Sequence, residues 1–287
     1  MSCSRGEFLR GVIAALGGSQ LVAAASAADA TDARGGGRRG RLRIAHLTDP
    51  QFGFGQKFKT VEENYPVDLE CFERALRKVN ALKPDIAVIT GDMTHNAEDV
   101  VKDWPRLLKA FQVPVYVAPG NHDMGRHVTK ENYERYLSVF GYDRKAFDVK
   151  GWRIIIGNTQ FLFGTELQGE QAAYNAWVKA ELEKAKEYKG RVILVGHYPP
   201  FVNGWNETDG YENFPRVLRQ DRIRMYRQAG AAFMLAGHTH RFGIRGYKEL
   251  TILNAEVTSN SFDSRPLGFR MFEIGDDMDY SYNFVGV

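Results

Sequence analysis

Five short clusters of polar residues in this 287-residue chain each follow directly on a short apolar run. The metal-ligand types in these clusters are Asp49, Gln51, Asp92, Asn121, His197, His238 and His240. Mixed oxygen and imidazole donors suit Mn, Fe or Zn better than an ion that prefers thiolate ligands. Seven donors exceed the need of one ion, so the pattern predicts two divalent or trivalent metal ions that share a bridging carboxylate.

Two metal ions about 3.5–4 Å apart can clamp the attacking and leaving oxygens of an in-line displacement. They also lower the pKa of a bound water, which supplies hydroxide near neutral pH. Hydrolysis of phosphate esters is the reaction that most needs these properties. His122 lies beside a candidate ligand but outside the ligand set. It is the candidate general acid, because an imidazole that titrates near neutrality can protonate a leaving alkoxide.

Short buried strands must carry these residues, and helices must separate the strands. Apolar runs occupy 42–47, 86–90, 113–118, 153–157, 191–196 and 231–236, and helical patterns lie near 67–82, 99–111, 129–140, 169–188 and 214–229. After residue 240 the pattern predicts strands alone, at 242–247, 249–255, 267–274 and 279–285. The alternation predicts one α/β domain over residues 41–287, with the site at the carboxyl ends of the strands.

The ordered clusters resemble the pattern of the calcineurin-like metallophosphoesterase superfamily, which is D-x-H, G-D, G-N-H-[D/E], H and G-H-x-H. All five blocks occur in order between residues 49 and 240. The resemblance implies a four-layer αββα sandwich of two mixed β-sheets flanked by helices. It also implies that the strands after residue 240 supply the second sheet, and that residues 41–287 form the catalytic domain.

The resemblance also implies a role for each matching position. Asp49 and His240 match ligands of the first metal, Asp92 matches the bridging carboxylate, and Asn121, His197 and His238 match ligands of the second metal. His122 matches the catalytic histidine of the G-N-H block. The Asp-Pro-Gln sequence at residues 49–51 is similar to a branch that includes a eukaryotic serine/threonine protein phosphatase.

Two positions depart from the family pattern. Gln51 stands where a histidine is usual, and its neutral, harder carbonyl donor shifts the expected preference of the first site toward Mn or Mg-like ions. Direct ligation by Gln51, ligation through water and no ligation all remain open. His95 stands where many protein phosphatases have an aspartate that orients the catalytic histidine. Either Asp123 or a backbone carbonyl must therefore hold His122, or its role as an acid is weaker than the family pattern implies.

Three residues are candidates for substrate binding. Arg126 follows the G-N-H-D block and can pair bidentately with a phosphate, although a solvated loop arginine explains it equally well. His95 can touch substrate or be an ordinary loop histidine. Tyr198 begins a loop rich in glycine, asparagine and aromatic residues, which suits either a substrate wall or packing onto the body. His46 lies inside an apolar run and is interpreted as a buried supporting histidine rather than a ligand.

The resulting hypothesis is a dinuclear phosphoesterase that acts on phosphomonoesters, with phosphoserine or phosphothreonine in proteins as one candidate substrate. A metal-bound hydroxide would attack phosphorus and His122 would protonate the leaving oxygen. The partner is therefore a phosphorylated small molecule or protein. The alternatives are a phosphodiesterase for nucleotide or phospholipid diesters and a metal-binding module with little catalysis. A nucleotide-binding α/β protein is disfavoured, because neither common glycine-rich phosphate motif is present.

Charge and cysteine content further limit the class of protein that this chain can be. Residues 1–43 carry a net charge of +4, so the rest of the chain carries −1 within the overall +3. This distribution gives no indication of a nucleic-acid-binding domain. Cys3 and Cys71 are the two cysteines, and no intrachain disulfide is expected because Cys3 lies in the predicted leader.

The first 28 residues have the layout of an export signal. Arg5 and Arg10 precede a stretch rich in Ala, Gly, Val and Leu that ends in small residues. Residues 4–10 resemble the twin-arginine consensus S-R-R-x-F-L-K, with Gly6 in place of the second arginine. Residues 29–40 are typical of a flexible linker. The prediction is a periplasmic or extracellular protein without an integral membrane span, or a cytoplasmic protein if the leader is a non-functional tail.

Overall fold

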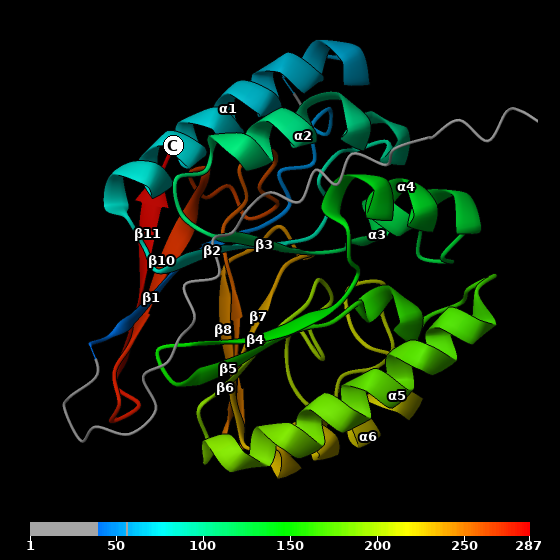
Figure 1. The fold of residues 1–287 in the computed structure, drawn as a ribbon. Helices are drawn as coiled ribbons and strands as arrows, with labels where there is room; N and C mark the ends of the chain where they lie inside the picture. The colour runs from blue at the N-terminus through cyan, green and yellow to red at the C-terminus, as the bar shows by residue number, and fades with distance from the viewer. Residues whose placement is uncertain (1–39, 56) are drawn as a thin grey trace, which may run out of the picture.

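The computed structural model describes residues 40–55 and 57–287, so the predicted export signal and nearly all of the predicted linker lie outside the described residues. Two β-sheets form the centre of the molecule (Figure 1). The first has the order β11-β10-β1-β2-β3. Its strands are β1 Leu42–Leu47, β2 Ile86–Thr90, β3 Val115–Ala118, β10 Gly268–Ile274 and β11 Tyr280–Gly286. The parallel strands β1, β2 and β3 sit side by side, while β10 runs antiparallel to β1.

The second sheet has the order β4-β5-β6-β7-β9-β8. Its strands are β4 Lys145–Val149, β5 Trp152–Ile156, β6 Val192–Val195, β7 Ala231–Ala236, β8 Gly243–Tyr247 and β9 Leu250–Asn254. Strands β5, β6, β7 and β9 are parallel to one another, and β4 and β8 are antiparallel edge strands. Both sheets are therefore mixed, as predicted.

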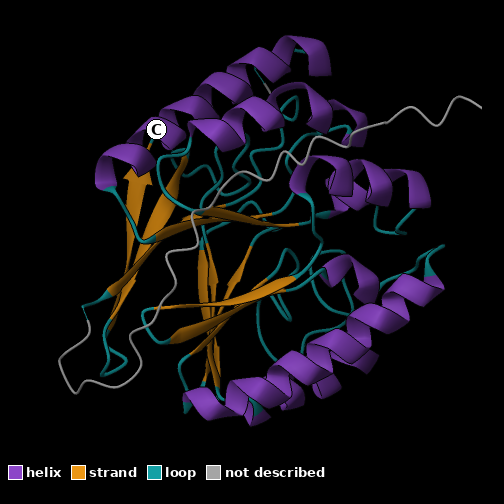
Figure 2. Ribbon diagram, in the orientation of Figure 1, coloured by secondary structure: helices purple, strands orange, loops and turns teal. Residues whose placement is uncertain are grey.

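Helices cover the outer face of each sheet (Figure 2). The helices are α1 Val61–Leu82, α2 Val100–Ala110, α3 Asn121–Met124, α4 Lys130–Phe140, α5 Gln168–Ala185 and α6 Arg216–Gln228. The described residues also form three short 3₁₀ segments, Ala97–Asp99, Thr159–Leu162 and Lys186–Tyr188, each between a strand and a helix. Helices α1 and α2 lie over the first sheet and α5 and α6 over the second (Figure 1). The four-layer αββα sandwich expected from the resemblance is confirmed.

Alternation along the strands divides the apolar core into two clusters. In β1, Ile44 faces the space between the sheets, where Val88, Ile154 and Phe233 also lie. Ala45 points the other way, into the cluster under the helices. Successive side chains of a strand face opposite sides, so strands buried on both faces must be apolar throughout. This requirement explains the continuous apolar runs in the sequence.

The expectation that the strands after residue 240 form the second sheet is wrong. Strands β8 and β9 do join the second sheet, but β10 and β11 extend the first sheet beyond β1. Strand β10 is buried along nearly its whole length, and Phe272 contributes to the core between the sheets. Adding it to β1 covers an edge that would otherwise expose unpaired backbone groups. Strand order along the chain does not reveal such a long-range partner.

Two local features also differ from the predicted elements. Strand β4 was not predicted, because its partly exposed sequence Lys-Ala-Phe-Asp-Val lacks a continuous apolar run. Helix α1 begins six residues before its predicted start. The Thr60 hydroxyl accepts a hydrogen bond from the Glu63 N–H at 3.2 Å, which caps the helix. Pro66 therefore lies inside the helix.

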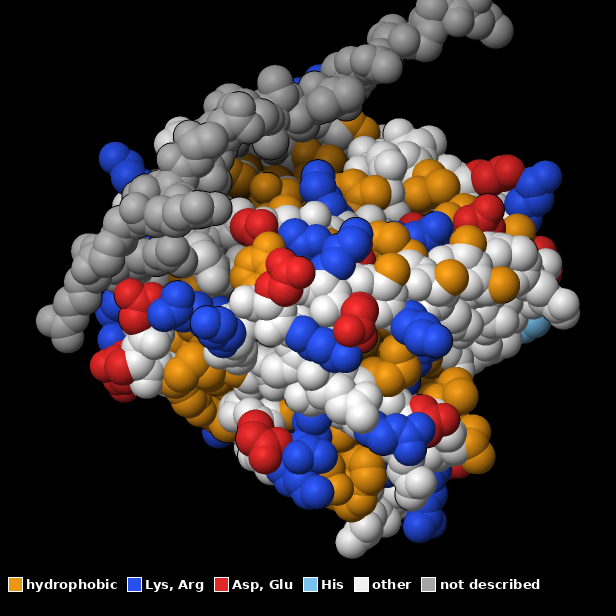
Figure 3. Space-filling model, turned by 60° about the horizontal axis from the view of Figure 1, so that its bottom comes forward, with side chains coloured by type: hydrophobic (Ala, Val, Ile, Leu, Met, Phe, Trp, Pro, Cys, Tyr) orange, Lys and Arg blue, Asp and Glu red, His pale blue; other side chains and the backbone are white. Residues whose placement is uncertain are grey.

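Charged side chains of both signs are interspersed on the face shown in Figure 3, where lysine and arginine alternate with aspartate and glutamate. No helix within the described residues is both long enough and apolar enough to span a bilayer.

Strand β10 carries a buried ion pair that gives a test of the fold. Arg270 donates to both carboxylate oxygens of Glu256 at 2.7 and 2.6 Å. Glu256→Gln is expected to lower the free energy of unfolding by about 3–5 kcal/mol, because it leaves a buried guanidinium without its counter-charge. Urea unfolding measures this change. Combining it with Arg270→Met should recover most of the loss, whereas Glu70→Gln in an exposed pair should cost less than about 1 kcal/mol.

Candidate metal centre

The predicted ligands meet where parallel strands of both sheets end. Asp49 and Gln51 follow β1, Asp92 follows β2, and Asn121 opens α3 after β3. From the second sheet, His197 follows β6, and His238 and His240 follow β7. Hydrogen bonds between backbones hold these ends together, as in Gln51 N–H to the carbonyl of Asp92 at 2.8 Å and Gly237 N–H to the carbonyl of His197 at 2.8 Å. The site is therefore built jointly by the two sheets.

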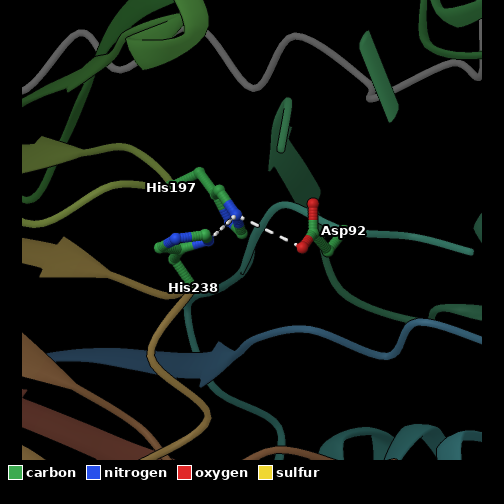
Figure 4. A group of neighbouring side chains, drawn as sticks. All are labelled: Asp92, His197 and His238. Atoms are coloured by element: carbon green, nitrogen blue, oxygen red, sulfur yellow. Dashed lines mark hydrogen bonds and ion pairs between the residues drawn. The ribbon is translucent and has the colours of Figure 1, made fainter. Parts of the chain in front are cut away.

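One group of donors gathers around His197 (Figure 4). Its Nε2 lies 3.3 Å from Asp92 Oδ2, 3.0 Å from Asn121 Oδ1 and 3.1 Å from His238 Nδ1. One ligand atom from each of Asp92, His197 and His238 falls within 4.8 Å of the others. Such convergence of carboxylate, amide and imidazole donors matches a site for a divalent metal ion.

A second group consists of Asp49, Asp92 and His240, again with ligand atoms within 4.8 Å of one another. Asp49 Oδ1 lies 3.4 Å from His240 Nε2. Asp92 belongs to both groups, which is the arrangement that a bridging carboxylate requires. Asp49 and Asp92 are almost completely buried.

Backbone carbonyls set the orientation of the three histidines. His197 Nδ1 lies 2.7 Å from the carbonyl of Thr90, His238 Nε2 lies 3.1 Å from the carbonyl of Tyr211, and His240 Nδ1 lies 2.6 Å from the carbonyl of Asn260. A carbonyl only accepts, so each of these ring nitrogens carries the proton. The other nitrogen of each ring then points its lone pair toward the other candidate metal ligands, as in protein metal sites.

Gln51 has a buried side-chain oxygen with no hydrogen-bond partner. Buried polar atoms are almost always satisfied, so an unpaired buried carbonyl oxygen two residues after Asp49 fits a cation as its partner. Together with the two donor groups, this atom shows that the residues present suit bound metal ions. Direct ligation by Gln51 stays a prediction.

The electrostatics of the centre favour positive charge. Burial raises the pKa of Asp92, but His197 and His122 lower it by more. The pKa of Asp92 therefore lies well below its usual value. Burial likewise lowers the pKa of His197, but Asp92 and Asp49 raise it more, to about 9. The buried carboxylates thus attract a cation to this position, whether a proton or a metal ion.

His122 is held by a backbone carbonyl, which was one of the two predicted possibilities. Its Nδ1 lies 2.8 Å from the carbonyl of His95, and the two rings stack with centroids 5.1 Å apart. The ring of Phe54 also stacks on that of His95 at 5.2 Å, and it lies 6.2 Å from the ring of His122. Asp123, the other possibility, accepts instead from the backbone N–H groups of Asp92, Met93 and Gly120. It joins the loops after β2 and β3.

The predicted substrate-binding residues occupy different environments. Arg126 is exposed, and its guanidinium lies 4.9 and 5.1 Å from the rings of Phe163 and Tyr211. Tyr198 is fully buried and packs against His238, with ring centroids 4.0 Å apart. It therefore supports His238 and forms no open wall. The exposed aromatic residue of that loop is Tyr211, at 54% exposure.

His46 supports the site from below, as interpreted from the sequence. Its two ring nitrogens lie 2.6 Å from the Tyr282 hydroxyl and 3.1 Å from the Thr90 hydroxyl. Thr90 donates to Thr48 at 2.7 Å, and Thr48 donates to the carboxylate of Asp49. Sequence reasoning missed this chain and the three orienting carbonyls. Backbone carbonyls have no sequence pattern, but the threonines flanking Asp49 and Gly91 offered a usable indication.

The ligand loops adopt backbone conformations that side chains usually avoid. Positive φ angles occur at Asp49, Gln51, Asp92, His238 and His240, between 36° and 70°. Residues other than glycine rarely occupy this region, and they do so mainly where function requires it. Glycines next to the ligands permit the close approach. A Cβ on Gly237 would lie 2.1 Å from Thr48 Oγ1 and 2.7 Å from Asp49 Oδ2.

Gly237→Ala therefore tests whether tight packing holds the first donor group. The added methyl must displace Thr48 and Asp49, so the affinity for Mn²⁺ is expected to fall by at least tenfold in a calorimetric titration, about 1.4 kcal/mol. Gly246→Ala is the control, because a Cβ there meets nothing within 4 Å. Equal Mn²⁺ affinities in the two variants would contradict the argument.

Comparison with known proteins identifies similar sequences. The chain is 27% identical over 222 residues to serine/threonine-protein phosphatase CPPED1 of Rattus norvegicus, over 71% of this chain and 71% of the relative. It is 28% identical over 181 residues to probable glycerophosphodiester phosphodiesterase GpdQ of Arcobacter nitrofigilis, over 62% and 64% of the two chains.

A solved structure shares the fold. A dimetal phosphatase from Danio rerio superposes with a TM-score of 0.56 at 14% identity, over 85% of this chain and 98% of that one. The sequence profile described as calcineurin-like phosphoesterase matches residues 42–242. Since this match spans well over half of the chain and contains every predicted ligand, the chain belongs to the calcineurin-like phosphoesterase family.

Proposed function

We propose that this metallophosphoesterase hydrolyses phosphate monoesters with two metal ions, held by the two donor groups that share Asp92. The observation that carries the proposal is this sharing, because one carboxylate common to two groups of donors suits a pair of ions. Asp49, Gln51 and His240 would complete one site, and Asn121, His197 and His238 the other. The neutral oxygen of Gln51 favours Mn²⁺ over an ion that prefers nitrogen ligands.

Bound ions would neutralise the charge of the phosphate and make hydroxide available near neutral pH. The chain supplies the remaining functions. The carbonyl of His95 fixes the Nδ1 proton of His122, so Nε2 is the atom that can carry a proton to the leaving oxygen. The stack on His95 and Phe54 limits the movement of the His122 ring. We assign His122 the role of general acid.

Arg126 is the residue best placed to contact the substrate's anionic group. Among the described residues no carboxylate pairs with Arg126. Its guanidinium contacts two aromatic rings and the carbonyl of Gly210 at 3.5 Å. A planar guanidinium free of a carboxylate can pair bidentately with phosphate oxygens. His95 would contact the substrate only at the edge of its stacked ring.

The relatives support two substrate classes. The name of CPPED1 states a serine/threonine-protein phosphatase, which supports phosphoserine and phosphothreonine as substrates here. The name of GpdQ states a glycerophosphodiester phosphodiesterase, which supports diester hydrolysis as the second candidate. We favour monoesters because residues 49–51 resemble the branch that includes a serine/threonine protein phosphatase. The predicted leader supports export of the protein to the periplasm or the exterior.

Parallel assays of p-nitrophenyl phosphate and bis-p-nitrophenyl phosphate, with Mn²⁺, Fe²⁺ or Zn²⁺ added, test the proposal. A larger kcat/KM for the monoester supports it, and a larger value for the diester supports the second candidate. Binding of ions without turnover of either ester would identify a metal-binding module instead.

His122→Asn is expected to lower kcat for p-nitrophenyl phosphate by about 10²- to 10⁴-fold, because it removes the proton donor. The metal content, measured by elemental analysis, should stay at the wild-type value. The control is His127→Asn, at an exposed histidine a short way along the chain from His122. This variant should retain kcat within about threefold. Wild-type turnover in the His122 variant would exclude its role as general acid.

Asp92→Asn is expected to reduce the bound metal below one ion per chain, because both donor groups lose their shared carboxylate. Elemental analysis after gel filtration gives the stoichiometry. Glu98→Gln, at an exposed acidic residue on the same loop, should leave it unchanged. Two ions retained by the Asp92 variant would show that this carboxylate is not a bridge.

A further inference from the structure

Residues 199–215, the later part of the loop between β6 and α6, contact one of the two donor groups, and we call this segment the arm. At its tip the Tyr211 carbonyl lies 3.1 Å from His238 Nε2, and the Tyr211 hydroxyl accepts from Asn121 Nδ2 at 3.2 Å. The Tyr211 ring lies 5.0 Å from that of His238. One residue of the arm thus touches two proposed ligands of the same ion.

The arm is ordered by its own polar side chains. The Glu207 carboxylate accepts from the N–H groups of Val202 and Asn203 at 2.8 and 2.7 Å, and from the Asn213 amide. Asn213 Oδ1 in turn accepts from Gly210 N–H at 3.0 Å, directly before Tyr211. These bonds fix the path of the backbone on both sides of Tyr211, so the position of its carbonyl depends on them.

A buried arginine connects the arm to the body of the protein. Arg219 on α6 is 1% exposed and donates to the carbonyls of Trp205, Glu207 and Phe214 at 3.2, 2.8 and 3.1 Å. Its paired carboxylate, Asp209, is 4.0 Å away and largely exposed. Burying a guanidinium is costly unless hydrogen bonds compensate it, and here three arm carbonyls accept from its two Nη groups. The arginine therefore holds the arm in place.

We propose that the arm is a positioning element for the ion bound by Asp92, Asn121, His197 and His238, and that Arg219 is its anchor. The Tyr211 carbonyl keeps the proton on His238 Nε2, so that Nδ1 faces His197 and Asp92. The group of Asp49 and His240 is oriented by the Asn260 carbonyl instead, outside the arm. Disturbing the arm should therefore lower the affinity for one ion and leave the affinity for the other unchanged. The inference rests on the proposed function only in requiring that these donors bind ions.

The ion and the ordered arm are coupled by one free energy, which acts equally on both. If the arm raises the affinity for the ion, then the ion must stabilise the arm by the same free energy. Mn²⁺ should consequently slow the exchange of the arm's backbone amides. This readout uses the wild-type protein and needs neither turnover nor a variant.

The test is a calorimetric Mn²⁺ titration of the full chain and of Arg219→Met. The variant should lose about 10- to 100-fold in affinity at one site and keep wild-type affinity at the other, the range found when a partner that orients a ligand is removed. Electron paramagnetic resonance should then report a single Mn²⁺ where the wild type shows a coupled pair. Arg224→Met on the same helix, at an exposed arginine paired with Asp221, is the matched control.

Tyr211→Phe separates the carbonyl from the hydroxyl. It keeps the backbone contact with His238 and should change both affinities by less than about threefold. A loss as large as that of Arg219→Met would overturn the role of the carbonyl. Equal loss at both sites, or no loss in a folded Arg219 variant, would overturn the inference. If Arg219→Met does not fold, amide exchange of the wild-type arm decides, and exchange unaffected by Mn²⁺ counts against the proposal.

Failure of the proposed function gives a different result. A wild-type protein that binds two ions but hydrolyses neither ester contradicts the enzymatic proposal and leaves the affinity split intact. A wild-type protein that binds no Mn²⁺ overturns both.

Discussion

The mutual repulsion of two buried carboxylates is the constraint on which this structure depends. Asp49 and Asp92 sit almost completely out of contact with solvent, within a few ångströms of each other. Burial penalises a charged group strongly unless opposite charge or hydrogen bonds compensate. Two imidazoles, of His197 and His240, and the backbone N–H groups of His122 and His238 provide part of this compensation. The proposed cations would complete it, which would link the stability of the centre to its chemistry.

The loops that carry the candidate ligands adopt a strained backbone, which brings these charges together. Each non-glycine residue in the left-handed region costs about 1–2 kcal/mol, and several of the ligands adopt it. Such turns persist only where the surroundings leave no alternative. Here Asp123 ties Asp92 and Gly120 together, and the carboxylate of Asp49 accepts from the N–H of His238. The strain is thus distributed over loops that the two sheets hold rigidly.

Sequence alone located the candidate ligands that the structure brings together, because their side chains are chemically distinctive and each follows an apolar strand. It could not locate the groups that aim them, because the carbonyls of Thr90, Tyr211 and Asn260 belong to residues without a shared type. The same limit applies to the fold. Strand β10 reads as an ordinary apolar strand, and its pairing with β1 joins segments more than 220 residues apart. Local pattern predicted the elements, whereas burial of a particular edge decided their order.

The pairing of β10 with β1 has a consequence for biosynthesis. A chain emerging from the ribosome makes β1 early, yet this strand stays unpaired on one side until residue 274 has been translated. The segment between β9 and β10 supplies the Ser259 hydroxyl that donates to the carbonyl of Asp49, and the Asn260 carbonyl beside His240. A nascent polypeptide therefore lacks the complete pocket until residue 274 has been translated. Loading of the proposed centre with metal would accordingly follow the synthesis of β10 and would depend on the ions available from that stage onward.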